Sequence, residues 1–350
     1  MKSRSIAGSI VLLALLVAGA VAASSATASS ASKRDSGSLI GAGSTFVSPL
    51  VSLWSKDYPS KTGVSITYGG GGSGAGITAI TNKTVDFAGS DAPLTSDQAK
   101  ACGDCVQIPW ALGATAIVYN VNGAKQGLHI TGPVLAQIFM GGVTKWDAPA
   151  LKKLNPGVNL PGEDIKVVYR SGASGTSYNL TDYLSKVSPA WKSKVGATTT
   201  PSFPVGQGAS GSSGEAGTVS RTEGAIGYVD TAFAVAQHLH FFFVKNAASK
   251  FAGPGLRGID AAGGTIKKGD VPANNEIHIV NPSAKVKQAY PICTFTYVIV
   301  HKSSPKAAQL RKFIFYALTQ GQSFARKLLF GKMPLAVLSA SEKTLKTVTG

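Results

Sequence analysis

The sequence predicts an α/β fold. Three segments, at residues 39–58, 64–80 and 165–187, each combine a short apolar stretch typical of a strand, a loop of small residues, and apolar residues at helical spacing. Units of this kind pack as helices against a sheet. Residues 29–350 provide enough chain for two packed domains.

The first residues predict export. Two basic residues precede an apolar stretch at residues 6–23, and an A-x-A cleavage site follows at residues 26–28. We expect a signal peptide at residues 1–28, an unstructured Ser-rich tether at residues 29–38, and a periplasmic or extracellular protein. The apolar stretch is also just long enough to span a bilayer, so an uncleaved membrane anchor is the alternative.

In the first unit, Leu39 and Ile40 lead into "GAGSTF" at residues 41–46. The apolar residues that follow keep near-helical spacing: Leu50, Leu53, Trp54 and Tyr58. Pro49 is tolerated in the first turn of a helix. The loop therefore precedes a helix start, where free backbone N–H groups can meet an anion.

The second unit alternates apolar residues at 64–68, turns through "GGGGSGAG" at residues 69–76, and begins a helix by residues 77–80. Its glycines match G-x-G-x-x-G, with Asp91 about 20 residues further on, as in a dinucleotide-binding motif. Four consecutive glycines match many spacings by chance, and an exported protein rarely meets a nicotinamide cofactor. No Lys-Ser or Lys-Thr follows the last glycine, as a P-loop would require.

The third unit carries the most specific loop, "RSGASGT" at residues 170–176. Ser174, Gly175 and Thr176 fall at a predicted helix N-terminus, where unpaired N–H groups and the macrodipole favour an anion. Arg170 adds a fork-shaped cationic partner. The alternative is that Ser174 or Thr176 only caps the helix while Arg170 lies in solvent.

Two aspartates flank a short strand pattern in "TVDFAGSDAPLT" at residues 84–95, and Pro93 stops regular structure just beyond it. We expect Asp86 to be structural, in a turn or a cap. Asp91, at the end of the strand, is either structural as well or faces a ligand.

The formal net charge of +17 favours anionic partners. The basic residues are scattered and no aromatic-interleaved basic stripe occurs, so we expect a general steering field and no nucleic-acid binding. Binding to acidic polymers of the cell envelope stays open.

Three cysteines are present. Cys102 and Cys105 are close enough for a small disulfide in an oxidising compartment, and Cys293 lies in an apolar run as an expected buried free thiol. A redox or zinc role for the first pair would need a partner pair that the sequence lacks.

No sequence motif indicates catalysis, since G-x-S-x-G and H-E-x-x-H are both absent. His238 and His240 would suit a metal from one face of a strand, but beside residues 241–243, all phenylalanine, they more often edge a core. We expect no enzyme, no metal and no cofactor.

Six segments occur in the order and spacing of one family: "GAGSTF", "YGGGGSGAG", "VDFAGSDAPL", "KWDAPALKKLNPGVNLP", "RSGASGTSYNLTDYL" and "EGAIGYV". The chain thereby resembles the phosphate-binding proteins that feed Pst-type ABC transporters, over essentially all of its mature length. The resemblance implies a type II periplasmic-binding-protein fold, in which two α/β lobes joined by a hinge close over one phosphate. Residues 39–119 and 291–350 would form lobe one, and residues 120–290 would form lobe two.

The same resemblance implies a set of ligand residues: Thr45, Phe46, Ser73, Asp91, Arg170, Ser174, Gly175 and Thr176. One position departs from the family. Many members carry an aspartate two residues after the arginine, where it orients the guanidinium, and this chain has Gly172.

The expected function is a monomeric receptor that delivers inorganic phosphate to a membrane permease. A dry site must replace the hydration of phosphate with directed donors. An ionised Asp91 would accept the proton that phosphate keeps near neutral pH. The carboxylate would therefore bind phosphate and repel an anion that carries no proton. The alternatives are a secreted phosphatase or other phosphoryl-transfer enzyme, and a receptor for another oxyanion.

Overall fold

The computed structural model describes residues 37–350. The predicted signal peptide at residues 1–28, and residues 29–36 of the predicted tether, lie outside the described residues. The first strand begins at Ser38, the last residue of the predicted tether, because Ser38 already pairs with Ser65 of the neighbouring strand.

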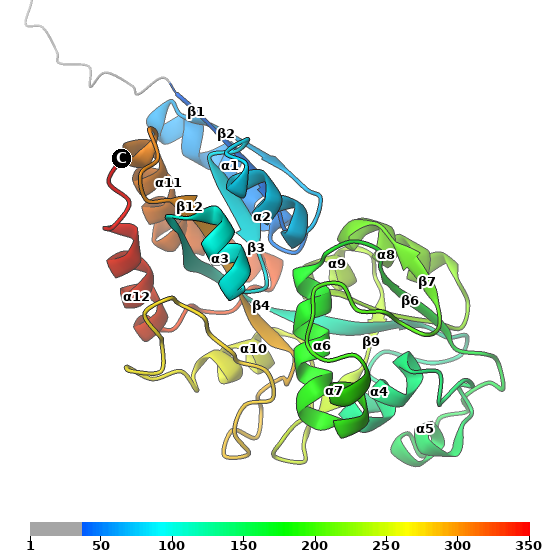
Figure 1. Ribbon diagram of the computed structural model, residues 1–350. Coiled ribbons are helices and arrows are strands. Elements are labelled where there is room, and N and C mark those ends of the chain that lie inside the picture. Colours follow the sequence, from blue (N-terminus) through cyan, green and yellow to red (C-terminus); the bar gives the residue numbers. More distant parts are fainter. Residues whose placement is uncertain (1–36) are drawn as a thin grey trace, which may run out of the picture. The chain divides into compact units, whose positions relative to one another are not determined.

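The main sheet is mixed, and its strands follow the spatial order β2, β1, β3, β12, β4, β8, β6, β7, with β9 also paired to β4 (Figure 1). Their bounds are β1 (Ser38–Gly43), β2 (Ser65–Gly69), β3 (Phe87–Ser90), β4 (Cys105–Asn120), β6 (Lys166–Arg170), β7 (Gln207–Ala209), β8 (Ala225–Asp230), β9 (His240–Phe241) and β12 (Cys293–His301). A smaller sheet contains β5 (His129–Ile130), β10 (Phe243–Lys245) and β11 (Phe251–Ala252).

The long strand β4 joins the two halves of the main sheet. Its residues 105–114 pair antiparallel with β12, and its residues 115–120 pair antiparallel with β8. On one side of β4 and β12, the strands β1, β2 and β3 run parallel to one another, and on the other side β6, β7 and β8 do the same. The carboxyl ends of parallel neighbours meet at one sheet edge, so each group sends its following loops to a common place.

The three predicted strand–loop–helix units are confirmed. They are β1 with α1 (Ser48–Thr62), β2 with α2 (Ser73–Thr81), and β6 with α6 (Gly175–Val187). The other helices are α3 (Ser96–Cys102), α4 (Gly132–Phe139), α5 (Pro149–Leu154), α7 (Pro189–Lys194), α8 (Gly211–Arg221), α9 (Thr231–Ala236), α10 (Leu256–Gly263), α11 (Ala307–Leu318), the 3₁₀ helix η1 (Gln320–Leu328) and α12 (Leu335–Leu345).

Two large apolar clusters hold these layers together. In one, Trp54 of α1 meets Trp110 of β4 edge to face, with ring centroids 5.1 Å apart. In the other, Tyr119 packs on Phe242 at 4.6 Å. Cys293 lies fully buried in this second cluster as a free thiol, as the sequence predicts.

Asp86 is structural, but it serves neither as a turn residue nor as a helix cap. Its Oδ2 accepts the backbone N–H of Ile40 at 2.8 Å and the ammonium of Lys306 at 2.8 Å, so it joins β1 to the segment before α11. No helix within residues 37–350 has both the length and the apolar character that a membrane span requires.

Candidate functional site

The predicted site residues follow the carboxyl ends of parallel strands. Thr45 and Phe46 come after β1, Ser73 after β2, and Asp91 directly after β3. Arg170 ends β6, and the loop that follows leads into α6. The sheet topology therefore delivers side chains from distant parts of the sequence to one cluster.

Asp91 is fully enclosed. The Ser44 hydroxyl lies 2.6 Å from each of its carboxylate oxygens, and its backbone N–H donates to Ser73 Oγ at 3.1 Å. Burial raises the pKa of Asp91 from 3.8 to about 7, while Ser44 and the charge of Arg170 act in the opposite direction. Near neutral pH this carboxyl can therefore hold or release a proton, so the ionised form expected from the sequence is one of its two states.

Arg170 does not lie in solvent, which rules out that part of the alternative interpretation of its loop. It is only 6% exposed, and its Nη1 makes two long contacts of 3.5 Å, with Thr176 Oγ1 and Ser212 Oγ. Its Nε is buried with no hydrogen-bond partner among the described residues. A buried cation whose donors are so weakly engaged has unused capacity for an anion.

At the N-terminus of α6, the predicted cap is confirmed. Ser174 caps the helix, since its Oγ accepts the N–H of Ser177 at 3.2 Å, while the N–H of Gly175 donates to Ser73 Oγ at 3.1 Å. A Cβ on Gly175 would lie 2.5 Å from Ser73 Oγ and 2.7 Å from Asp91 Cβ, so only glycine allows this close approach.

Residues near β1 and β2 meet the chain around α6 and α8 directly. Thr45 Oγ1 lies 2.9 Å from Ser212 Oγ and accepts the Ser212 N–H at 3.1 Å. The N–H of Gly74 donates to the carbonyl of Ala173 at 3.0 Å. Phe46 contributes its backbone, whose N–H donates to Ser44 Oγ at 3.1 Å, while its ring is buried against Phe330.

Four polar residues of this cluster were missed in the sequence: Ser44, Ser212, Glu215 and Asp230. Ser44 lies inside the loop "GAGSTF" already noted in the sequence. Ser212 and Glu215 lie in the first turns of α8, within the small-residue stretch "GASGSSGEAG", and Asp230 is the last residue of β8.

Glu215 and Asp230 are buried carboxyls. Burial raises the pKa of each to about 8; the charge of Arg170 holds the pKa of Glu215 down, and the charge of Asp91 pushes that of Asp230 up. Glu215 Oε1 accepts the N–H of Tyr228 at 2.9 Å, and the Tyr228 hydroxyl accepts the N–H of Arg170 at 3.1 Å. Gly172 is exposed with open space where a Cβ would lie, and the buried carboxyls that respond to the charge of Arg170 are Asp91 and Glu215, neither of which belongs to the loop of Arg170.

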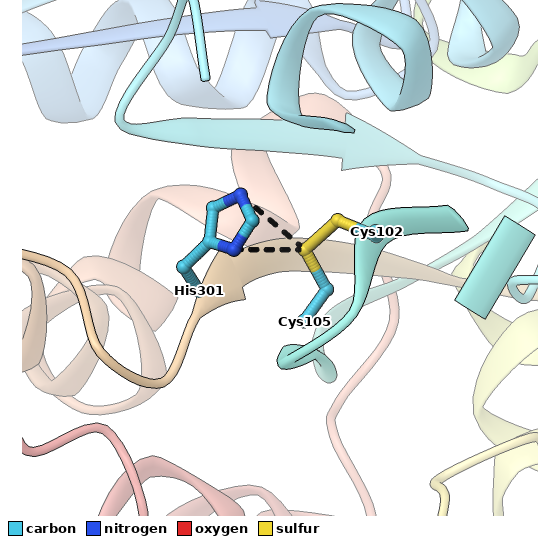
Figure 2. Close-up of side chains that lie close together, drawn as sticks. All are labelled: Cys102, Cys105 and His301. Carbon is cyan, nitrogen blue, oxygen red and sulfur yellow. Dashed lines mark hydrogen bonds between the residues drawn. A yellow bond between two sulfur atoms is a disulfide. The ribbon is translucent and has the colours of Figure 1, made fainter. Parts of the chain in front are cut away.

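A second cluster joins Cys102, Cys105 and His301 (Figure 2). The two cysteines form a disulfide, and both ring nitrogens of His301 lie 3.7 to 3.8 Å from Cys105 Sγ. The sequence does not reveal this partner, which the pairing of β12 with β4 brings opposite Cys105. The His301 nitrogens contact Asp104 Oδ1 and the Ile80 carbonyl, so disulfide and ring are both already engaged and we assign no metal to them. Within the described chain, His238 and His240 belong to no such group.

The chain is similar to known proteins over most of its length. A family model described as a PBP superfamily domain matches residues 28–320. The phosphate-binding protein PstS of Xylella fastidiosa (strain 9a5c) is 37% identical over 314 residues, which cover 89% of this chain and 85% of that protein. PstS of Pasteurella multocida is 33% identical over 314 residues, covering 88% and 90%.

Solved structures agree on the fold. A high-affinity periplasmic phosphate-binding protein, bound with phosphate at pH 8.5, superimposes with a TM-score of 0.71 at 23% identity, covering 87% of this chain and 93% of that one. A putative phosphate ABC transporter substrate-binding protein from Clostridium perfringens gives a TM-score of 0.60 at 19% identity, covering 85% and 100%.

The fold is thus that of a two-lobed, type II periplasmic binding protein, as predicted. Within the PBP superfamily, the chain belongs to the family of Pst-type phosphate-binding proteins.

Proposed function

We propose that this protein is an extracytoplasmic receptor for inorganic phosphate that delivers its ligand to the membrane permease of an ABC transporter. One observation carries the proposal: a single buried cation, Arg170, and the N-terminus of α6 face a buried carboxyl, Asp91, that has a pKa of about 7. Family membership agrees with it, since relatives over most of the chain are named phosphate-binding proteins.

The proposed ligand groups are the eight residues expected from the sequence: Thr45, Phe46, Ser73, Asp91, Arg170, Ser174, Gly175 and Thr176. The hydroxyls and backbone N–H groups supply donors, and Arg170 supplies charge. Asp91 supplies an acceptor. Phosphate near neutral pH can share a proton with this carboxyl, whereas sulfate cannot, so we assign the choice between the two oxyanions to Asp91.

In this proposal lobe one comprises residues 39–119 and 291–350, and lobe two comprises residues 120–290. Among the contacts that would then join the lobes, three lie at the site: Thr45 with Ser212, Ser73 with Gly175, and Gly74 with Ala173. An anion held between Arg170 and the β1 to β3 loops adds to these contacts, so binding would stabilise closure. We propose a monomer, exported by the N-terminal segment.

Calorimetric titration of residues 29–350 with phosphate, sulfate and arsenate tests the proposal. We expect tight binding of phosphate and much weaker binding of sulfate. Because Ser44 is hydrogen-bonded to Asp91, an arrangement that also suits a nucleophile and its base, the same preparation should be assayed with a phosphomonoester. Turnover of the ester, or equal affinity for sulfate, would overturn the proposal in favour of a phosphatase or of a general oxyanion receptor.

A further inference from the structure

The two most exposed large apolar side chains of the described residues lie on adjacent helices. Leu335, the first residue of α12, is 79% exposed, and Phe315 of α11 is 52% exposed. The two helices pack against each other through the same apolar cluster. Single exposed apolar side chains are ordinary on a protein surface, so these two gain significance only from the charged residues around them.

Cationic side chains surround Leu335. A hollow of about 1080 Å³ lies between α12 and the segment after α10, and five exposed lysines line it: Lys267, Lys268, Lys302, Lys332 and Lys343. None of the salt bridges among the described residues involves any of these five lysines. The one carboxylate of the hollow, Asp260, already accepts from Arg326 Nη1 at 2.9 Å and from the Lys332 N–H at 2.7 Å.

The contact between α11 and the C-terminal end of α12 repeats this composition on a smaller scale. A second hollow of about 300 Å³ is lined by Phe315 and Leu345 together with Arg311, Lys312 and Lys346, and Glu342 is its only acidic residue. We call Leu335, Phe315 and the cationic residues of these two hollows the α12 face.

We propose that the α12 face binds the surface of a membrane through the phosphate groups of anionic phospholipids, with Leu335 and Phe315 entering the interface. A basic surface with protruding apolar side chains is the composition that adsorbs to anionic bilayers. The site is separate from the Arg170 cluster, none of whose residues line either hollow.

An acidic protein segment is the other partner that such charge would suit. The membrane is favoured because the two apolar side chains project from different helices and share no apolar cleft that would receive a peptide side chain. Lysine ammonium groups are point charges on flexible stems, which suit mobile headgroups better than one fixed carboxylate pattern.

Flotation of residues 29–350, which contain the whole compact unit of residues 35–350, with lipid vesicles tests the proposal. We expect binding to vesicles with about one-third phosphatidylglycerol, little binding to pure phosphatidylcholine, and loss of binding at about 0.5 M salt. The double variant Lys268→Glu, Lys343→Glu should weaken binding at least about tenfold. Its control is Lys192→Glu, Lys194→Glu on α7, where two exposed lysines are reversed without touching the α12 face.

A second pair of variants, one on the α12 face and one control, tests the contribution of the apolar side chains to vesicle binding. Leu335→Ser should weaken vesicle binding severalfold, whereas Val235→Ser on α9, at a position 46% exposed, should not. All four variants should keep the wild-type affinity for phosphate, which shows that they fold. The proposal fails if the wild type ignores anionic vesicles, if the control variants lose as much binding, or if soluble glycerol phosphate displaces the vesicles at matched concentration. Binding to an acidic peptide without binding to vesicles would also overturn it.

Discussion

The Arg170 cluster and the α12 face both favour anions, by opposite physical means. Arg170 is buried with two buried carboxyls, Asp91 and Glu215, that respond to its charge, and hydroxyls and N–H groups lie around them in fixed positions. The five lysines of the larger hollow on the α12 face are exposed, and no salt bridge among the described residues involves any of them. Buried, directed groups discriminate between similar ligands, whereas exposed point charges attract any anion and yield to salt.

The largest expected effect is on the selectivity between anions, which should distinguish the Arg170 cluster from the α12 face. Above about pH 7, where Asp91 is mostly ionised, wild-type protein should prefer phosphate over sulfate about a thousandfold, because sulfate would leave this carboxylate unpaired in a dry site. Asp91→Asn should narrow this ratio, since an amide can donate to a fully ionised oxygen. Calorimetry with both anions at about pH 8 measures the ratio. An unchanged ratio would mean that Asp91 does not choose the anion.

The second effect concerns Arg170. Arg170→Lys should weaken phosphate binding by roughly 1.5 to 3 kcal/mol, because an ammonium cannot reproduce a guanidinium fork in a buried site. Arg326→Lys is the matched control, as Arg326 pairs with Asp260 at the surface. Equal affinities for wild type and Arg170→Lys would place the anion elsewhere.

The third effect is a pH dependence that the three buried carboxyls produce. Burial raises the pKa of Asp91 to about 7 and that of Glu215 and Asp230 to about 8, above their ordinary values of 3.8, 4.5 and 3.8. Between about pH 4 and 8 the folded chain therefore holds protons that the unfolded chain releases. Stability should fall as pH rises, by about 1.4 kcal/mol per unit for each such group.

Urea unfolding of the phosphate-free protein at several pH values within this window measures that slope. Glu215→Gln should reduce the slope by the share of one group, whereas neutralising exposed Asp164 should not change it. A stability that rises with pH would show that these carboxyls are not held protonated in the fold.

The smallest effect is expected from salt on phosphate binding. Raising the salt from about 0.05 M to 0.5 M should change the phosphate affinity less than about tenfold, because buried charges are screened little. The same change should abolish binding of vesicles to the α12 face. A similar salt dependence in both assays would contradict the difference in burial and screening that we infer between the Arg170 cluster and the α12 face.

Local patterns were sufficient for part of the site. Asp91 was identifiable because it follows a short strand, and Arg170 because a small-residue loop leads from it into a helix. Glu215 was not identifiable from the sequence, because a glutamate inside "SSGEAG" resembles an exposed polar residue. Only the packing of α8 against β8 buries it. The lysines of the α12 face are scattered over the sequence, so their convergence depends on tertiary structure alone.

The strand β4 has a consequence for how the chain folds during synthesis. Its residues 105–114 are paired on one side by β12, which lies close to the C-terminal end of the chain. Since a polypeptide emerges N-terminus first, this mostly buried, apolar segment lacks its β12 partner until residues 293–301 have been made. An open edge of this kind pairs readily with other chains. The shared strand that unites the two halves is therefore open to pairing with other chains while residues 121–301 are made.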